Sequence, residues 1–110
     1  MTLAEKIKMY KEKEQFVNDL SEVFKNNPKY HSVATIEYGV CSREVADHTY
    51  FEEWIIVHFV GGGMCPRRVT GNSNIANFQV ISQLIDGGYY EEMYEYVEML
   101  DHGFKFIDLN

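Results

Sequence analysis

The segment from residue 51 to residue 88 limits the possible folds of this chain more than any other. It reads FEEWIIVHFV, then three glycines, then MCPRRVT, then GNSN, and finally IANFQVISQLIDGG. The β-branched and aromatic stretch predicts a strand, the glycines predict a tight turn, and MCPRRVT predicts a returning strand. GNSN supplies candidate helix caps, and apolar residues at helical spacing follow it. We therefore expect the remaining segments to pair with this strand or to cover this helix.

Two further features complete the predicted sheet. Residues 31–45 alternate in their middle part, where one face carries Ala34, Ile36, Tyr38 and Val40. A turn at residues 46–49 leads to residues 50–60, which are apolar on both faces, as is typical of a central strand. Pro66 cannot donate to a strand ladder, so the third strand, over residues 64–70, should lie at an edge or carry a bulge.

Helices are predicted on both sides of these strands. Thr2 and Glu5 form a capping box, and apolar residues then recur at helical spacing as far as Phe24. This stripe weakens at residues 11–15, where we expect the helix to stand clear of the body. A second helix ends at Gly87 and Gly88, and a third carries an apolar stripe of Tyr90, Met93, Val97 and Leu100.

The order α-β-β-β-α-α, with or without a last short strand over residues 104–109, predicts an α+β fold. We expect an antiparallel meander of three to four strands covered by helices. The 110 residues fit a single domain, residues 1–110, and 45% hydrophobic residues with 15% aromatic residues are enough for a core. No apolar run reaches the ~20 residues of a membrane span, and the charged N-terminal segment does not read as a secretion signal. We expect a cytoplasmic protein.

Charge is distributed unevenly along the chain. Residues 1–30 carry six lysines and five acids, whereas residues 31–110 carry four bases and twelve acids, giving a net charge of −7. Such a potential repels phosphate backbones, so direct nucleic-acid binding is not expected and a basic protein partner is favoured.

The cysteines and histidines form no metal-binding motif. Cys41 and Cys65 stand alone, and the four histidines are scattered, so we expect no metal and no cofactor. The predicted register places Cys41 near Trp54 and Cys65 opposite Phe59, two strands apart, so no disulfide is expected.

Two arrangements could support small-molecule chemistry. Gly61, Gly62 and Gly63, with Arg67 and Arg68, could hold a phosphate or carboxylate, although no Walker or dinucleotide motif is present. A hairpin turn followed by exposed arginines is the interpretation that we favour.

The predicted register also brings charged side chains together. It places Glu37 opposite His58 and Arg43 opposite Glu52. A carboxylate beside an imidazole can begin an acid–base pair, but it is equally an ordinary cross-strand charge pair. Cys65, close to His58 and the two arginines, is interpreted as a core residue rather than a nucleophile.

The third helix has no basic residue and carries many acids and tyrosines. This pattern is typical of a solvated face, and it also suits a surface that binds a basic protein. Its candidate partner-binding residues are Tyr90, Glu91, Glu92, Tyr94, Glu95 and Glu98.

The sheet face away from the helices is the other candidate interface. It is predicted to present an apolar patch of Trp54, Ile56, His58, Met64 and Arg68. Either the N-terminal helix folds across this patch, giving a three-layer α/β/α domain, or a partner or a second copy of the chain covers it, which is the interpretation that we favour. On this prediction, Trp54→Ala weakens association by ~2 kcal/mol and leaves the fold intact.

Together these features favour a small acidic, non-catalytic protein-binding domain that acts on, and inhibits, a basic or nucleic-acid-binding protein. Antidotes and counter-defence proteins of mobile elements have this size and charge. The alternative is a domain or small enzyme that binds a nucleotide or phosphorylated molecule at residues 61–68.

Overall fold

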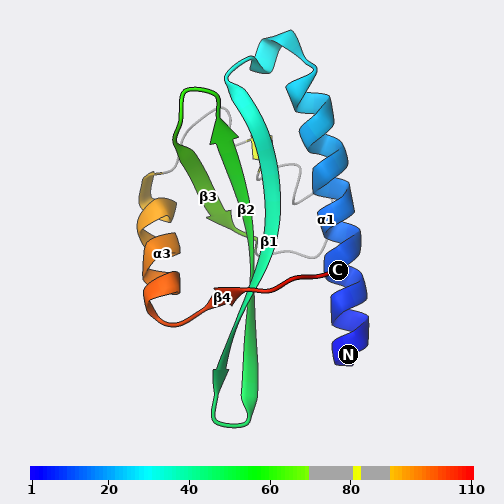
Figure 1. Ribbon diagram of the computed structural model, residues 1–110, viewed down its shortest axis with the longest axis vertical. Helices are drawn as coiled ribbons and strands as arrows, with labels where there is room; N and C mark the ends of the chain where they lie inside the picture. The colour runs from blue at the N-terminus through cyan, green and yellow to red at the C-terminus, as the bar shows by residue number, and fades with distance from the viewer. Residues whose placement is uncertain (70–80, 83–89) are drawn as a thin grey trace.

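The computed structural model describes residues 1–69, 81–82 and 90–110, and only the backbone of residues 90–92. The predicted second helix and its two-glycine stop lie largely outside the described residues. The elements in chain order are α1 (Leu3–Lys25), a 3₁₀ turn (Pro28–Tyr30), β1 (Val33–Val45), β2 (His48–Phe59), β3 (Met64–Arg68), α3 (Tyr90–Asp101) and β4 (Lys105–Phe106). Figure 1 shows α1 and α3 on opposite sides of the sheet.

The sheet confirms the predicted antiparallel meander. Its strand order is β3-β2-β1-β4, so β2 and β1 are central and the Pro66 strand is an edge, as its missing N–H requires. The short fourth strand pairs with β1 at Cys41 and Ser42. Phe106 of this strand lies over Gly39, where an added Cβ would come within 2.7 Å of the ring. A glycine at this position therefore lets β4 close on β1.

Both predicted hairpin registers are wrong by two residues. Val45 pairs with His48, so the first turn contains only Ala46 and Asp47, and Ala46 adopts φ 55°. A two-residue turn matches the right-handed twist of the strands better than the four-residue turn that we predicted.

The shifts of both hairpins move every cross-strand partner. Arg43 lies opposite Tyr50 rather than Glu52, and Thr35 rather than Glu37 lies opposite His58. Cys41 lies opposite Glu52 rather than Trp54, and Cys65 lies opposite Val57 rather than Phe59. Because side chains alternate with a period of two, an even shift leaves every side chain on its predicted face.

One face of the sheet packs on α1 as predicted. Ile36, Tyr38 and Val40 of β1 and Ile55 and Val57 of β2 are buried with residues of α1. The Thr2–Glu5 capping box is present, since the Glu5 N–H donates to the Thr2 hydroxyl at 3.2 Å. At the other end of the helix, the buried Ser21 hydroxyl accepts the Ile36 N–H at 2.9 Å. This bond satisfies a β1 backbone donor and ties α1 to the strand.

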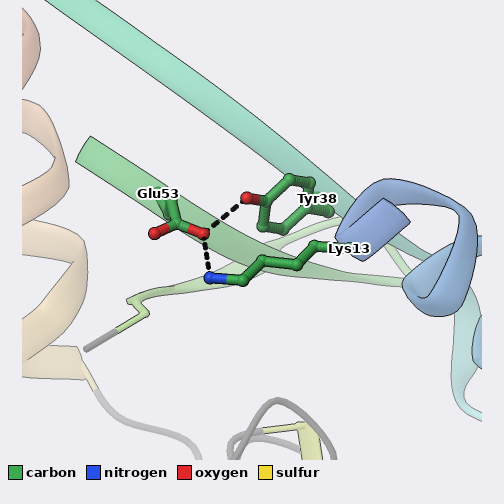
Figure 2. A network of polar contacts seen from close by, with 3 residues as sticks. All are labelled: Lys13, Tyr38 and Glu53. Carbon is green, nitrogen blue, oxygen red and sulfur yellow. Dashed lines mark hydrogen bonds and ion pairs between the residues drawn. The ribbon is translucent and has the colours of Figure 1, made fainter. Parts of the chain in front are cut away.

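The middle of α1 does not stand clear of the body, contrary to the prediction for residues 11–15. Lys13 is buried, and its Nζ donates to Glu53 Oε1 on β2 at 2.6 Å. The Tyr38 hydroxyl donates to the same oxygen at 2.6 Å, so three polar groups meet between helix and sheet (Figure 2). The long lysine stem packs as an apolar chain, which explains how a charged segment can cover a core.

The other face of the sheet is covered by α3, so it is not the exposed patch that we predicted. Trp54 is fully buried, together with Cys41 and Met99, and Tyr96 and Phe104 pack against them. The fold is thus three layers deep, with α1, the sheet and α3 (Figure 1). The predicted α3 stripe is also wrong, because Val97 and Leu100 are exposed whereas Tyr96 and Met99 face the sheet.

Candidate functional site

The inner face of α3 is held by an aromatic cluster around Trp54. Tyr96 packs edge-on to Trp54, with ring centroids 5.3 Å apart and an interplanar angle of 73°. The same tyrosine lies 6.1 Å from the Phe106 ring of β4. Burial raises the pKa of Tyr96 above its ordinary value, with smaller contributions from Glu37 and Cys41. The ring of Tyr96 is thus uncharged at physiological pH. Because it packs on the sheet, the opposite face of α3 points to solvent.

The outer face of α3 combines acids with exposed apolar side chains. Tyr94 is 76% exposed, and Val97 and Leu100 are also exposed. Glu95, Glu98 and Asp101 lie among them and are exposed as well. None of these three acids forms an ion pair within the part of the chain that the structure describes. We call Tyr94, Glu95, Val97, Glu98 and Asp101 the outer face of α3.

A hollow of about 280 Å³ lies between this helix and the sheet. It falls just below the ~300 Å³ at which small-molecule sites begin, so it suits a single side chain better than a metabolite. Three of its lining groups are carboxylates, and the lining comprises Glu52, Arg68, Glu95, Glu98, Met99, His102 and Phe104.

Arg68 is the only arginine or lysine among the described residues of that lining. Its Nη2 lies 3.5 Å from Glu52 Oε2, and its guanidinium lies 5.2 Å from the centroid of the Trp54 ring. The Trp54 indole N–H donates to the same Glu52 oxygen at 3.3 Å. Glu52 is thus partly neutralised, whereas Glu95 and Glu98 leave the rim negative.

A second, smaller hollow of about 190 Å³ continues along α3. It is lined by Tyr94, Val97, Glu98 and Asp101, so Glu98 belongs to both hollows. An apolar or aromatic side chain could settle against Tyr94 and Val97 while a neighbouring cation meets Glu98 or Asp101. Alternation of apolar and charged contacts is typical of protein–protein interfaces.

The acids of α3 are placed where they oppose the stability of the helix. Glu95, Glu98 and Asp101 are successive i, i+3 neighbours of like charge, and no basic residue occupies the last turn. Glu98 and Asp101 also face the negative end of the helix macrodipole, where a cation would stabilise the helix by about 0.3–1 kcal/mol. Folding alone does not explain this arrangement.

The structure separates the predicted partner-binding residues into three groups. Trp54 and Ile56 are buried, so an exposed Trp54 anchor is wrong, and Trp54→Ala should disturb the fold itself. His58, Met64 and Arg68 are partly buried, and Arg68 lies in the larger hollow. Tyr94, Glu95 and Glu98 lie on the outer face of α3, whereas the side chains of Tyr90, Glu91 and Glu92 lie outside the described residues.

The glycines and arginines of the alternative anion site are not brought together. Gly62 and Gly63 adopt φ 88° and 95° in the exposed turn between β2 and β3. Arg68 lies at the other end of β3, opposite Trp54, about 16 Å along the strand at 3.3 Å per residue. Arg67 and Arg68 are neighbours in a strand and therefore point to opposite faces. The two parts do not form one anion-binding site.

The remaining chemistry is sparse in the described residues. His58 Nε2 and Glu37 Oε1 lie 3.4 Å apart on the surface as a diagonal pair. Both cysteines are free, and among the residues that the structure describes no group of three or more Cys, His, Asp or Glu side chains is arranged to hold a metal. No helix in the described part of the chain is long and apolar enough to cross a membrane.

Several residues of the site were missed by sequence reasoning. Val97 belongs to the outer face of α3, and Glu52, His102 and Phe104 line the larger hollow. His102 could have been found from the sequence, because it lies four residues after Glu98 and so on the same side of the helix. The place of Glu52 depends on the register and on α3 packing over β2 and β3, which no local pattern reveals.

Comparisons of the chain with protein-family models, with curated proteins and with solved structures find no match.

Proposed function

We propose that this chain is a small acidic, non-catalytic protein-binding domain that holds a basic protein on the outer face of α3. The observation that carries the proposal is a helix fixed to the sheet by Tyr96 and Met99 whose opposite face exposes Tyr94 among three acids. A rigid aromatic side chain loses little entropy on binding, and the acids steer a cationic partner towards it.

A basic nucleic-acid-binding protein fits this surface by charge spacing. Successive acids at positions 95, 98 and 101 rise by about 4.5 Å along the helix axis. Phosphates of one DNA strand rise by about 3.4 Å per nucleotide, so a groove that accepts phosphates can accept a similar row of carboxylates. Occupation of that groove would inhibit the partner, as expected for an antidote or counter-defence protein of a mobile element.

The test compares two immobilised variants with the same loss of negative charge. Glu95→Gln, Glu98→Gln and Asp101→Asn together neutralise the outer face of α3. Glu12→Gln, Glu22→Gln and Glu44→Gln together neutralise three exposed acids elsewhere and serve as the control. Proteins captured from native lysate by each variant and by the wild type are identified by mass spectrometry.

We expect a basic protein on the wild type and on the control, and at least tenfold less of it on the α3 variant. Raising the salt to about 1 M, where the Debye length is ~3 Å, should release it. The captured protein should also lose nucleic-acid binding when the purified chain is added. Equal capture by all three chains, or capture that is indifferent to salt, would contradict the proposal.

A further inference from the structure

The turn end of the β1–β2 hairpin projects beyond both helices (Figure 1). Residues 43–50 are all exposed. β3 pairs with β2 only from Trp54 to His58, and β4 pairs with β1 only at Cys41 and Ser42. Within the described residues, this end of the hairpin has no neighbouring strand on either edge. A two-stranded ribbon is marginally stable by itself in water, so a cover for it would stabilise it.

A hollow of about 450 Å³ lies at the base of this ribbon. Apolar side chains make up most of its lining, which comprises Arg43, Val45, Tyr50, Phe51, Glu52 and Phe104. Tyr50 is 52% exposed and Val45 is exposed beside it. The same patch therefore presents both a projecting aromatic side chain and a hollow that could receive one.

The charges of this patch favour a second copy of the chain as the occupant. Arg43 forms no ion pair with any described residue, and the half-buried Glu52 shares one long contact with Arg68. The patch holds one cation and one carboxylate, so it is neutral on a chain whose net charge is −7. A twofold contact brings a patch against itself, so an approach of Arg43 to the Glu52 of the other copy would occur twice by symmetry. On the outer face of α3, by contrast, Glu95, Glu98 and Asp101 would repel the same face of a second copy.

We propose that this patch is the contact between two copies of the chain in a symmetric dimer. Tyr50 of each copy enters the hollow of the other, and Arg43 of each copy approaches Glu52 of the other. This contact uses the hairpin and leaves Tyr94 on the outer face of α3 free. The dimer and the binding of a basic protein are therefore independent, and each can fail without the other.

Sedimentation over a range of concentrations tests the dimer, with the wild type and three exposed-site variants. Tyr50→Asp removes the projecting ring and Arg43→Glu reverses the cation, whereas Tyr94→Asp is a matched control on α3. We expect Tyr50→Asp and Arg43→Glu each to raise the dimer Kd at least about tenfold, and Tyr94→Asp to leave it unchanged. Circular dichroism should show that all three variants are folded.

Two outcomes would overturn the dimer. One is a wild type that remains monomeric up to about 1 mM, a concentration at which even a weak contact would be populated. The other is a dimer that Tyr50→Asp weakens no more than Tyr94→Asp does. Loss of basic-protein capture by Tyr94→Asp with an unchanged dimer would show that the two surfaces act separately.

Discussion

The ion pair between Lys13 and Glu53 allows a quantitative test of how α1 is held on the sheet. The Lys13 side chain is only 3% exposed and that of Glu53 15% exposed, and Tyr38 donates to the carboxylate oxygen that Lys13 contacts. Glu53→Gln keeps the shape of the side chain and removes its charge. The ammonium of Lys13 then stays buried without the Glu53 carboxylate.

The expected loss can be bounded from both sides. Breaking a buried ion pair by removing one partner costs about 3–5 kcal/mol. A buried lysine without its carboxylate can also lose its proton, which costs about 4.6 kcal/mol for an ordinary lysine at pH 7. This cost sets an upper limit on the loss of unfolding free energy. We therefore expect Glu53→Gln to lower the free energy of unfolding by about 3–4.5 kcal/mol. Lys13→Met should cost less, about 2–3 kcal/mol, because Glu53 keeps the Tyr38 hydroxyl and some contact with water.

Urea unfolding at pH 7 of the wild type, both single variants and Lys13→Met/Glu53→Gln gives a double-mutant cycle. Each single variant leaves one charged partner buried, whereas the double variant leaves none. The loss of stability in the double variant should therefore be smaller than the sum of the two single losses by at least about 1–2 kcal/mol. Tyr38→Phe is the control for loss of a neutral donor alone and should cost about 1.5 kcal/mol. A Glu53→Gln loss below ~1 kcal/mol, with an additive cycle, would refute the reasoning.

Two further predictions concern alkaline pH and the glycine turn. Burial, with Glu52 second, raises the pKa of Cys41 from 9.0 to about 12, and burial raises that of Tyr38 above 10.0. Both groups stay neutral in the fold while the unfolded chain ionises. Stability is therefore retained below about pH 9, and it falls by up to ~1.4 kcal/mol per pH unit above about pH 9 for Cys41 and above about pH 10 for Tyr38. Urea midpoints that stay constant from about pH 8 to 11 would contradict this. Gly63→Ala, at φ 95°, should cost about 1–2 kcal/mol in urea unfolding, whereas Gly61→Ala, without a positive φ, should change stability by less than ~0.5 kcal/mol; equal losses would show that the turn conformation is unimportant.

The sheet could be predicted because its signals are local and alternate with a period of two. Ile36, Tyr38 and Val40 were correctly assigned to one face of the sheet, which α1 covers, even though the register was wrong by two residues. Residue-to-residue partners depend on turn length, and the sequence around Ala46 and Asp47 resembles a longer turn as much as a two-residue one. Faces were therefore predictable, whereas cross-strand pairs such as Arg43 with Glu52 were not.

The two corrections that matter for the site have a common physical cause, which is the amphipathic side chain. Lys13 was assigned to solvent by its charge, but a lysine stem covers a core well when a carboxylate receives its ammonium. Tyr96 was grouped with an acidic surface, but its ring covers Trp54. Charge and polarity at the tip of a side chain do not determine where its body lies, and only the tertiary partner does.

The placement of the α3 acids also bears on how the candidate site should be understood. A merely solvated helix face gains from mixed charges, since i, i+4 pairs of opposite sign stabilise a helix and a base near its C-terminus complements the macrodipole. Instead, α3 carries Glu98 and Asp101 near its C-terminus and no base in its last turn. Its inner face compensates, because burial of Met99 and the contact of Tyr96 with Trp54 fix the helix by packing that is independent of those charges. The acids thus lower the stability of a helix that packing holds in place. This is the arrangement expected where the charges act on a partner.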